Sequence, residues 1–191
     1  MNMKTSDNFS PYAVSRAIWG SILFFFWFII SLVFFDPDWS SVWPFICFHF
    51  VLLINTFFSI RSFASLTPKE NVGQHIIDAI LALCLIAMPL LFNLPLQFMI
   101  VCLFLFIVAV LKYLFLVPLV GFSKLLYWKI KVDMLGVVLC FLVLVGVIYG
   151  FSYISSIIFF IIFACANVYV LWWNPLYDLE LHTHEVPKKN K

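Results

Sequence analysis

Six long apolar stretches fill this sequence and constrain its fold more than any other feature. About 20 apolar residues in a helix span the roughly 30 Å hydrocarbon core of a bilayer. Only helices and closed barrels satisfy every backbone polar group in lipid, and these stretches are continuous rather than alternating, so we expect helices. The predicted spans are Arg16–Phe35, Trp43–Phe63, His75–Phe92, Leu96–Val117, Val132–Gly150 and Tyr153–Trp173.

The composition indicates that most of the chain lies within a membrane. The 191 residues are 65% hydrophobic and only 10% charged, which is more apolar surface than a soluble domain of this size can bury. We therefore predict an N-terminal tail over residues 1–15, a membrane domain over 16–173 and a C-terminal tail over 174–191. The partner that the composition predicts is the lipid bilayer. No sequence motif indicates binding to nucleic acid.

The distribution of charge predicts the orientation of the spans. If the N-terminus is cytoplasmic, every lysine and arginine except Lys112 falls on the cytoplasmic side, whereas Asp36 and Asp38 occupy the first outer turn. The positive-inside rule then predicts that both termini are cytoplasmic, in a plasma membrane of the bacterial inner-membrane kind. Short outer turns and longer inner loops predict an all-α domain of three helical hairpins, over residues 16–63, 75–117 and 132–173.

Four polar residues within or beside the spans are the candidates for a site: Asp78, Lys112, Asp133 and Asn167. Ionisable groups inside a membrane are costly and therefore mark functional sites by default. The favoured interpretation is structural: Asp78 pairs with Lys112 across a hairpin, and Asp78 and Asp133 each occupy a first helical turn, where a carboxylate complements the helix dipole. The alternative is a proton or ion relay.

Cofactors and metals are not predicted. His49 and His75 fall near opposite membrane faces, too far apart to ligate one haem, and we expect His49 to hydrogen-bond a neighbouring helix instead. All the cysteines fall inside spans without a CxxC pair, so neither a disulfide nor a redox site is expected.

Two further patterns predict local contacts. Tyr127 and Trp128 stand beside lysines in the second inner loop, which is typical of an anchor at the lipid headgroups. Gly146 and Gly150 form a GxxxG motif at the outer end of the fifth span. With Gly136 and Cys140 they form a stripe of small residues, which favours close approach of another helix of the same chain.

The layout resembles the HdeD-like family of small bacterial membrane proteins. The resemblance is carried by three helix–turn–helix units, namely Trp19–Phe63 with the turn Phe35-Asp36-Pro37, Ile77–Leu116 with the turn Asn93-Leu94-Pro95, and Val132–Trp172. It implies an inner-membrane protein linked to acid resistance, and it brings no catalytic residues with it.

Two functions follow from the sequence. The first is a non-enzymatic multi-pass membrane protein connected with acid stress or membrane integrity, acting through packing or a membrane partner protein. The alternative is a small proton- or ion-coupled transporter or channel, assembled as a homo-oligomer, in which Asp78, Asp133 and Lys112 line a cytoplasmic vestibule. No nucleophile set or metal-ligand motif indicates an enzyme.

Overall fold

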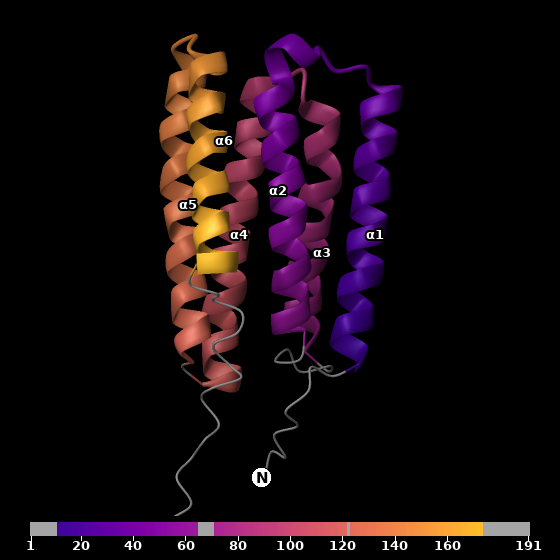
Figure 1. The fold of residues 1–191 in the computed structure, drawn as a ribbon. Coiled ribbons are helices and arrows are strands. Elements are labelled where there is room, and N and C mark those ends of the chain that lie inside the picture. Colours follow the sequence, from indigo (N-terminus) through magenta and orange to yellow (C-terminus); the bar gives the residue numbers. More distant parts are fainter. Residues whose placement is uncertain (1–10, 65–70, 122, 174–191) are drawn as a thin grey trace, which may run out of the picture.

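The computed structural model describes residues 11–64, 71–121 and 123–173, and within these ranges the chain is helical without strands (Figure 1). Six helices are long and apolar enough to cross a membrane, which confirms a multi-pass membrane protein. The predicted tail over 174–191 lies outside the described residues. The elements are α1 (Pro11–Phe34), α2 (Trp39–Phe63), α3 (Val72–Ala87), the 3₁₀ turn η1 (Met88–Leu91), α4 (Pro95–Val120), α5 (Lys124–Ile148), α6 (Ser152–Val168) and the π turn η2 (Tyr169–Trp173).

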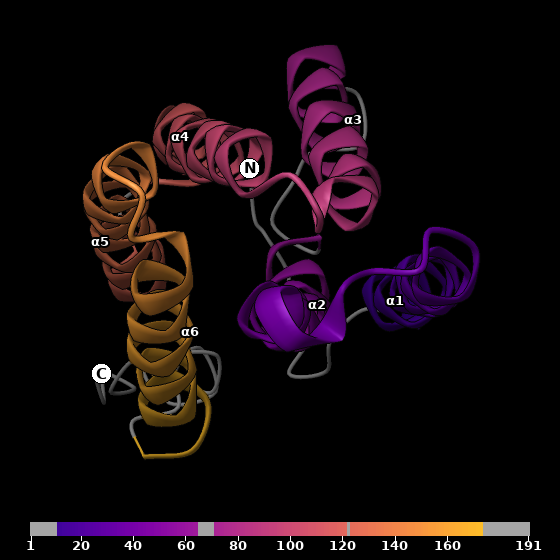
Figure 2. The same ribbon diagram turned by 90° about the horizontal axis from the view of Figure 1, so that it is seen from above.

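The helices run side by side along one axis, and the start of α1 and the end of η2 lie at the same end of the bundle (Figure 1). We call this end, which carries Arg16, Arg61 and Lys124, the basic end; Asp36 and Asp38 lie at the opposite, acidic end. Seen along the axis, the helices follow one another in the order α1, α2, α6, α5, α4, α3 (Figure 2), and each packs against the next. A slight contact between α1 and α3 closes the ring.

Side chains and backbone turns end the helices where the sequence supplies them. Asp38, Asn71 and Ser123 cap α2, α3 and α5, each side chain accepting a hydrogen bond from a backbone N–H of the first turn. Gly121 and Gly150 follow α4 and α5 with φ of 82° and 85°, a conformation that glycine adopts without strain.

The largest difference from the sequence prediction concerns α5, which begins at Lys124 instead of Val132. Leu125 and Leu126 are buried, so the supposed loop is two further helical turns whose apolar side packs into the bundle. Asp133 consequently lies in the third turn of α5, and Asp78 in the second turn of α3, which begins at Val72. The placement of both carboxylates in first turns was therefore wrong, and the helix dipole does not account for them.

Aromatic side chains form the apolar core towards the acidic end. The ring of Phe48 lies 4.3 Å from that of Phe159, and Phe45 lies 4.6 Å from Phe98, measured between centroids. These contacts join α2 to α4 and α6. His49 belongs to the same core: its ring packs against Phe28, and its Nδ1 has no hydrogen-bond partner among the described residues. His49 Nδ1 therefore makes no interhelical hydrogen bond to the described residues, and the ring packs against aromatic side chains.

The predicted small-residue stripe on α5 is an intramolecular packing surface at Gly136, Cys140 and Gly146. Gly150 does not take part, because it lies past the end of α5 and a Cβ there would meet nothing within 4 Å. Gly136 lies directly beneath the ring of Phe106 on α4. One turn further along, Cys140 Sγ lies 3.5 Å from Cys102 Sγ, and Gly146 faces Ser155 on α6. Small side chains at these positions let α5 approach both neighbouring helices closely.

This packing predicts opposite effects of two glycine substitutions. A Cβ at Gly136 would lie 2.6 Å from the Phe106 ring, so Gly136→Ala should lower the free energy of unfolding by about 1–3 kcal/mol. At Gly20 a Cβ would meet only Ile60 Cδ1, at 3.7 Å. Gly20→Ala should therefore be neutral or stabilise by up to about 1 kcal/mol. Unfolding of both variants in mixed micelles measures the difference, and equal stability would contradict the packing.

Candidate functional site

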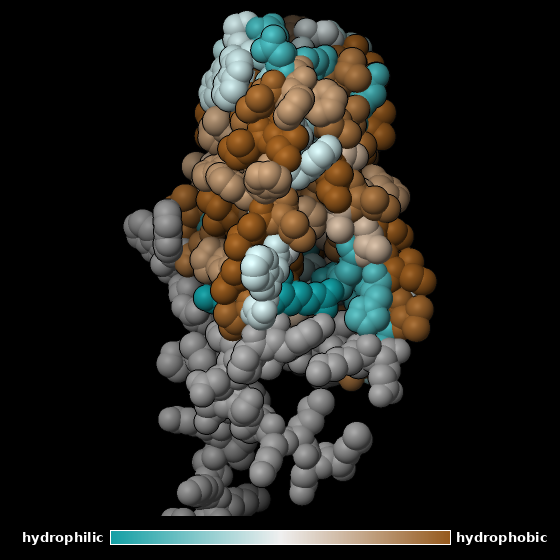
Figure 3. All heavy atoms as spheres, turned by 90° about the vertical axis from the view of Figure 1, so that its right-hand side faces the viewer, coloured by the Kyte–Doolittle hydropathy of each residue, from teal (hydrophilic) through white to brown (hydrophobic). Residues whose placement is uncertain are grey.

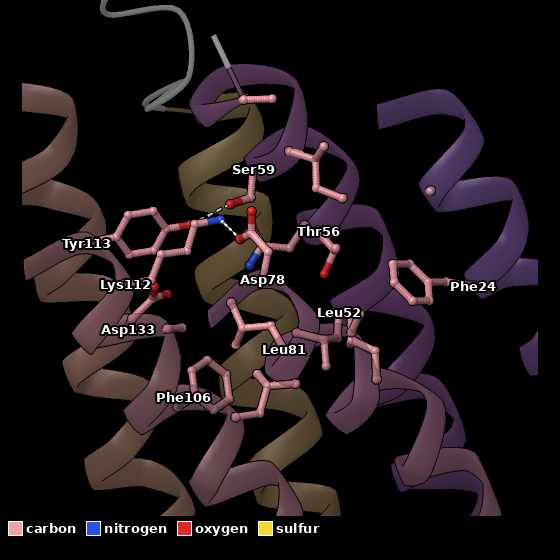
Figure 4. Close-up of a pocket in the computed structure, with 18 of the residues that line it drawn as sticks. Phe24, Leu52, Thr56, Ser59, Asp78, Leu81, Phe106, Lys112, Tyr113 and Asp133 are labelled. Carbon is pink, nitrogen blue, oxygen red and sulfur yellow. Dashed lines mark hydrogen bonds and ion pairs between the residues drawn. The ribbon is translucent and has the colours of Figure 1, made fainter. Parts of the chain in front are cut away.

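A cavity of about 240 Å³ lies among α1 to α5, in the half of the bundle nearer the basic end. We call it the charged chamber because Arg16, Asp78, Lys112, Lys129 and Asp133 line it. Figure 4 shows Ser59, Asp78 and Lys112 towards one end of the chamber, Leu81 and Phe106 towards the other, and Asp133 between them. The chamber is therefore amphipathic along its length.

Three charged residues from three helices form one ion-pair cluster. Lys112 Nζ on α4 lies 2.7 Å from Asp78 Oδ1, and Arg16 Nη2 on α1 lies 3.1 Å from Asp78 Oδ2. Both oxygens of Asp78 are thus occupied by cations. Gln74, one turn before Asp78 on α3, donates a hydrogen bond from Nε2 to the backbone carbonyl of Lys112 at 3.3 Å. Helix α3 therefore contacts both the side chain of Lys112, through Asp78, and its backbone carbonyl, through Gln74.

A second ion pair lies deeper in the protein and within a single helix. Lys129 Nζ is 2.8 Å from Asp133 Oδ1, at the i and i+4 positions of α5 where side chains meet. Both side chains are almost completely buried, with 5% and 2% of their surface exposed. Asp133 Oδ2 is buried without a hydrogen-bond partner in the described part of the chain. One carboxylate oxygen is therefore left open in the interior.

A second cavity, of about 290 Å³, lies on the other side of this pair, between α5 and α6; we call it the rear chamber. Lys129 and Asp133 line both cavities, as do Asn55 and Phe106. These four side chains form the wall that the two chambers share. Asn167 lines the rear chamber, where its Nδ2 donates a hydrogen bond to the Phe163 carbonyl of its own helix.

The structure brings together some of the predicted site residues and separates others. Asp78 and Lys112 form the expected interhelical pair. Asp133 pairs with Lys129 on its own helix, and Asn167 makes its hydrogen bond within α6. Tyr127 and Trp128 remain exposed, with the Lys131 ammonium over both rings, as an anchor at the headgroups would require.

Two charged members of the site were missed by sequence reasoning. Lys129 was counted with the loop lysines, although its spacing of four residues from Asp133 would have indicated a pair once that segment is helical. Arg16 carries no such signal. It reaches Asp78 only because α1 packs beside α3, a contact that hydropathy does not reveal.

The charged residues reach the surface on one face of the molecule. Figure 3 shows hydrophilic residues gathered around a hollow in the lower part of the described surface, surrounded by hydrophobic ones. Arg16 retains 33% of its side-chain exposure. The charged chamber is therefore closed by protein on its Asp133 side and more open at Arg16.

Buried ion pairs and two chambers inside six apolar helices define an integral membrane protein with a polar interior. No group of three or more histidine, cysteine, aspartate or glutamate side chains among the described residues could hold a metal ion. Comparison with protein-family models, curated proteins and solved structures finds no match to this chain.

The ion-pair cluster predicts unequal effects of removing its members. Asp78→Asn leaves two cations, one of them largely buried, without a counter-charge. Removal of one partner of a buried pair costs roughly 3–5 kcal/mol, and we expect a loss of stability near the lower value. Arg16→Gln keeps the Lys112–Asp78 pair, so its loss should stay below about 1 kcal/mol. Unfolding in mixed micelles tests this ranking, and an Arg16 variant less stable than the Asp78 variant would refute it.

Proposed function

We propose that this chain is a small, non-enzymatic proton- or ion-coupled membrane transporter that uses the charged chamber as its binding site. The observation that carries the proposal is Asp133, which is buried beside Lys129 with one oxygen lacking any partner in the described residues. A carboxylate that only stabilised the fold would gain from hydrogen bonds to both oxygens, because an unsatisfied buried acceptor costs about 1–3 kcal/mol. An open oxygen is instead suited to take a proton or a ligand.

The position of Asp133 supports the same function. It lines the charged chamber and the rear chamber, so a proton or ion held there has a cavity on either side. Ionisable groups inside membrane helices that face a cavity are typical of ion and proton pathways. Asp78, in contrast, has both oxygens occupied and fits a positioning role.

We further propose that the helices form three hairpins with both termini in the cytoplasm of a bacterial inner membrane. Arg16, Arg61 and Lys124 at the basic end, and Asp36 and Asp38 at the acidic end, support this orientation. The apolar faces outside the bundle are then covered by lipid, by a second copy or by a membrane partner protein.

Reporter fusions test the orientation. An alkaline phosphatase fused after Ser40 should be active, because this position lies at the acidic end, outside the cytoplasm. A fluorescent protein fused to the C-terminus should fluoresce in the cytoplasm. An active phosphatase at the C-terminus would refute the proposed orientation.

A role in acid stress, which the resemblance to the HdeD-like family implies, is compatible with this transport function. Asp133 favours it, because its open oxygen lies between the two chambers and a proton taken up there would change the charge of both. Flux that changes as the external pH is lowered would support this role, and flux independent of pH would contradict it.

Proton or ion flux through the purified protein tests the transport proposal. In liposomes containing a pH-sensitive dye, an imposed gradient should decay faster than in empty vesicles. Asp133→Asn should reduce the protein-dependent rate at least about tenfold, because the asparagine amide does not take up and release a proton as a carboxylate does. Asp36→Asn is the matched control: Asp36 is exposed at the acidic end with φ of 39°, which asparagine tolerates.

A double variant separates transport from stability. Lys129→Met with Asp133→Leu replaces the whole buried pair by apolar side chains, an exchange that is often neutral or stabilising. The double variant should stay folded and lack flux. Normal flux in this variant would show that the pair has only a structural role and would refute the proposal.

A further inference from the structure

We propose that the charged chamber binds a short-chain organic monoanion, with its carboxylate held by Arg16 and Lys112 and its apolar tail directed towards Leu81 and Phe106. This inference deepens the proposed function, on which it rests, by naming the class of solute. Four properties of the chamber support it: its charge, the occupancy of its carboxylates, its polarity and its size.

The chamber carries more positive than negative charge. Its lining contains three basic side chains, Arg16, Lys112 and Lys129, and two acidic ones, Asp78 and Asp133. The imbalance is localised, because Asp78 is the single carboxylate shared by Arg16 and Lys112. Uncompensated charge away from water is costly. A monoanion beside this cluster would restore neutrality, whereas a cation would increase the imbalance.

The carboxylates of the chamber offer little to a cation. Arg16 and Lys112 occupy one oxygen of Asp78 each, and Lys129 occupies one oxygen of Asp133. Among the carboxylate oxygens of the chamber, Asp133 Oδ2 is the one left without a partner by the described residues, and a single carboxylate oxygen beside the Lys129 ammonium is a poor site for a metal cation. Arg16 and Lys112 retain N–H groups for an anion, because each places one nitrogen against Asp78, whereas the guanidinium carries five N–H donors and the ammonium three.

The polarity of the chamber changes along its length. Figure 4 places Asp78, Lys112 and Ser59 towards one end, and Leu52, Leu81 and Phe106 away from them. A small inorganic anion would leave the apolar end unfilled. An anion with a short hydrocarbon tail matches both ends, because burial of the tail adds favourable free energy in proportion to its area.

The size of the chamber favours a short hydrocarbon chain. Its volume is about 240 Å³, and it is open at the Arg16 side. A carboxylate with a chain of a few carbons, such as hexanoate, fits this volume. A membrane phospholipid or a long fatty acid does not. Entry at the half-exposed side of Arg16 gives such a solute a route to the cations.

The test is equilibrium binding of hexanoate to the full-length protein in nanodiscs of zwitterionic lipid, followed by calorimetry, with empty nanodiscs subtracted. Hexanoate should bind more tightly than hexylammonium, which has the same tail and the opposite charge. Affinity should rise from acetate to hexanoate by about fourfold per methylene, the value expected for complete burial. Dodecanoate should gain nothing further, because its tail exceeds the cavity.

Substitutions at Arg16 locate the carboxylate. Arg16→Gln should weaken hexanoate binding about tenfold, because a charge-assisted hydrogen bond is lost, while the fold keeps its Lys112–Asp78 pair. Arg16→Lys keeps the charge and should retain most of the affinity. Equal affinity of the glutamine variant and the unchanged protein would overturn the proposal, as would equal binding of hexylammonium.

The monoanion site and the transport function can be refuted independently of each other. Hexanoate binding without any proton or hexanoate flux would support the binding site and refute the transport function. Proton flux without hexanoate binding would support transport and refute the monoanion as its solute. Dodecanoate binding in proportion to its longer chain would place the anion at the lipid-exposed surface and would also overturn the inference.

Discussion

The cost of holding charge inside lipid is the constraint on which this structure depends. A charged side chain at the centre of a membrane helix costs about 2.5–3.5 kcal/mol on insertion scales. Five charged side chains line one chamber here, in the half of the bundle nearer the basic end. Two ion-pair arrangements offset this cost, and they differ in which helices they connect. The Arg16–Asp78–Lys112 cluster joins three helices and so contributes to assembly of the bundle. The Lys129–Asp133 pair lies within α5, and the Lys129 ammonium also lies over the Tyr113 ring of α4, 5.6 Å from its centroid.

The chamber lies between two apolar clusters of different kind. Towards the acidic end, phenylalanines from α2, α4 and α6 pack ring against ring, and Phe48 and Phe159 are completely buried. Towards the basic end, a smaller cluster around Phe63, Leu116 and Leu125 closes the junction of α2, α4 and α5. Dense packing at both levels holds the helices at fixed separation, so the space between them stays open for polar side chains instead of collapsing. The apolar core thereby creates the conditions for a polar site.

The sequence was sufficient to predict the six spans and the Asp78–Lys112 pair, because hydropathy and the scarcity of charge are properties of the chain itself. It failed at α5, where lysines beside Tyr127 and Trp128 favoured a loop although Leu125 and Leu126 face the core. That error hid Lys129 as the partner of Asp133. Arg16 and the shared wall between the chambers depend on which helix faces meet. Helix faces in apolar spans are poorly marked, because lipid and protein neighbours both select for hydrophobic side chains.

The two ion-pair arrangements also differ in how easily they can open. Separation of Asp78 from both cations requires α1, α3 and α4 to move, because each partner is fixed to a different helix. Lys129 and Asp133 lie one turn apart on the same helix, so their separation requires no movement of one helix against another. The packing of Gly136 against Phe106 and of Cys140 against Cys102 therefore does not depend on this pair. Under the proposed transport function, a solute held at the Asp78 cluster would reach the rear chamber past the Lys129–Asp133 pair, and loss of the Asp133 charge would weaken the attraction that holds Lys129.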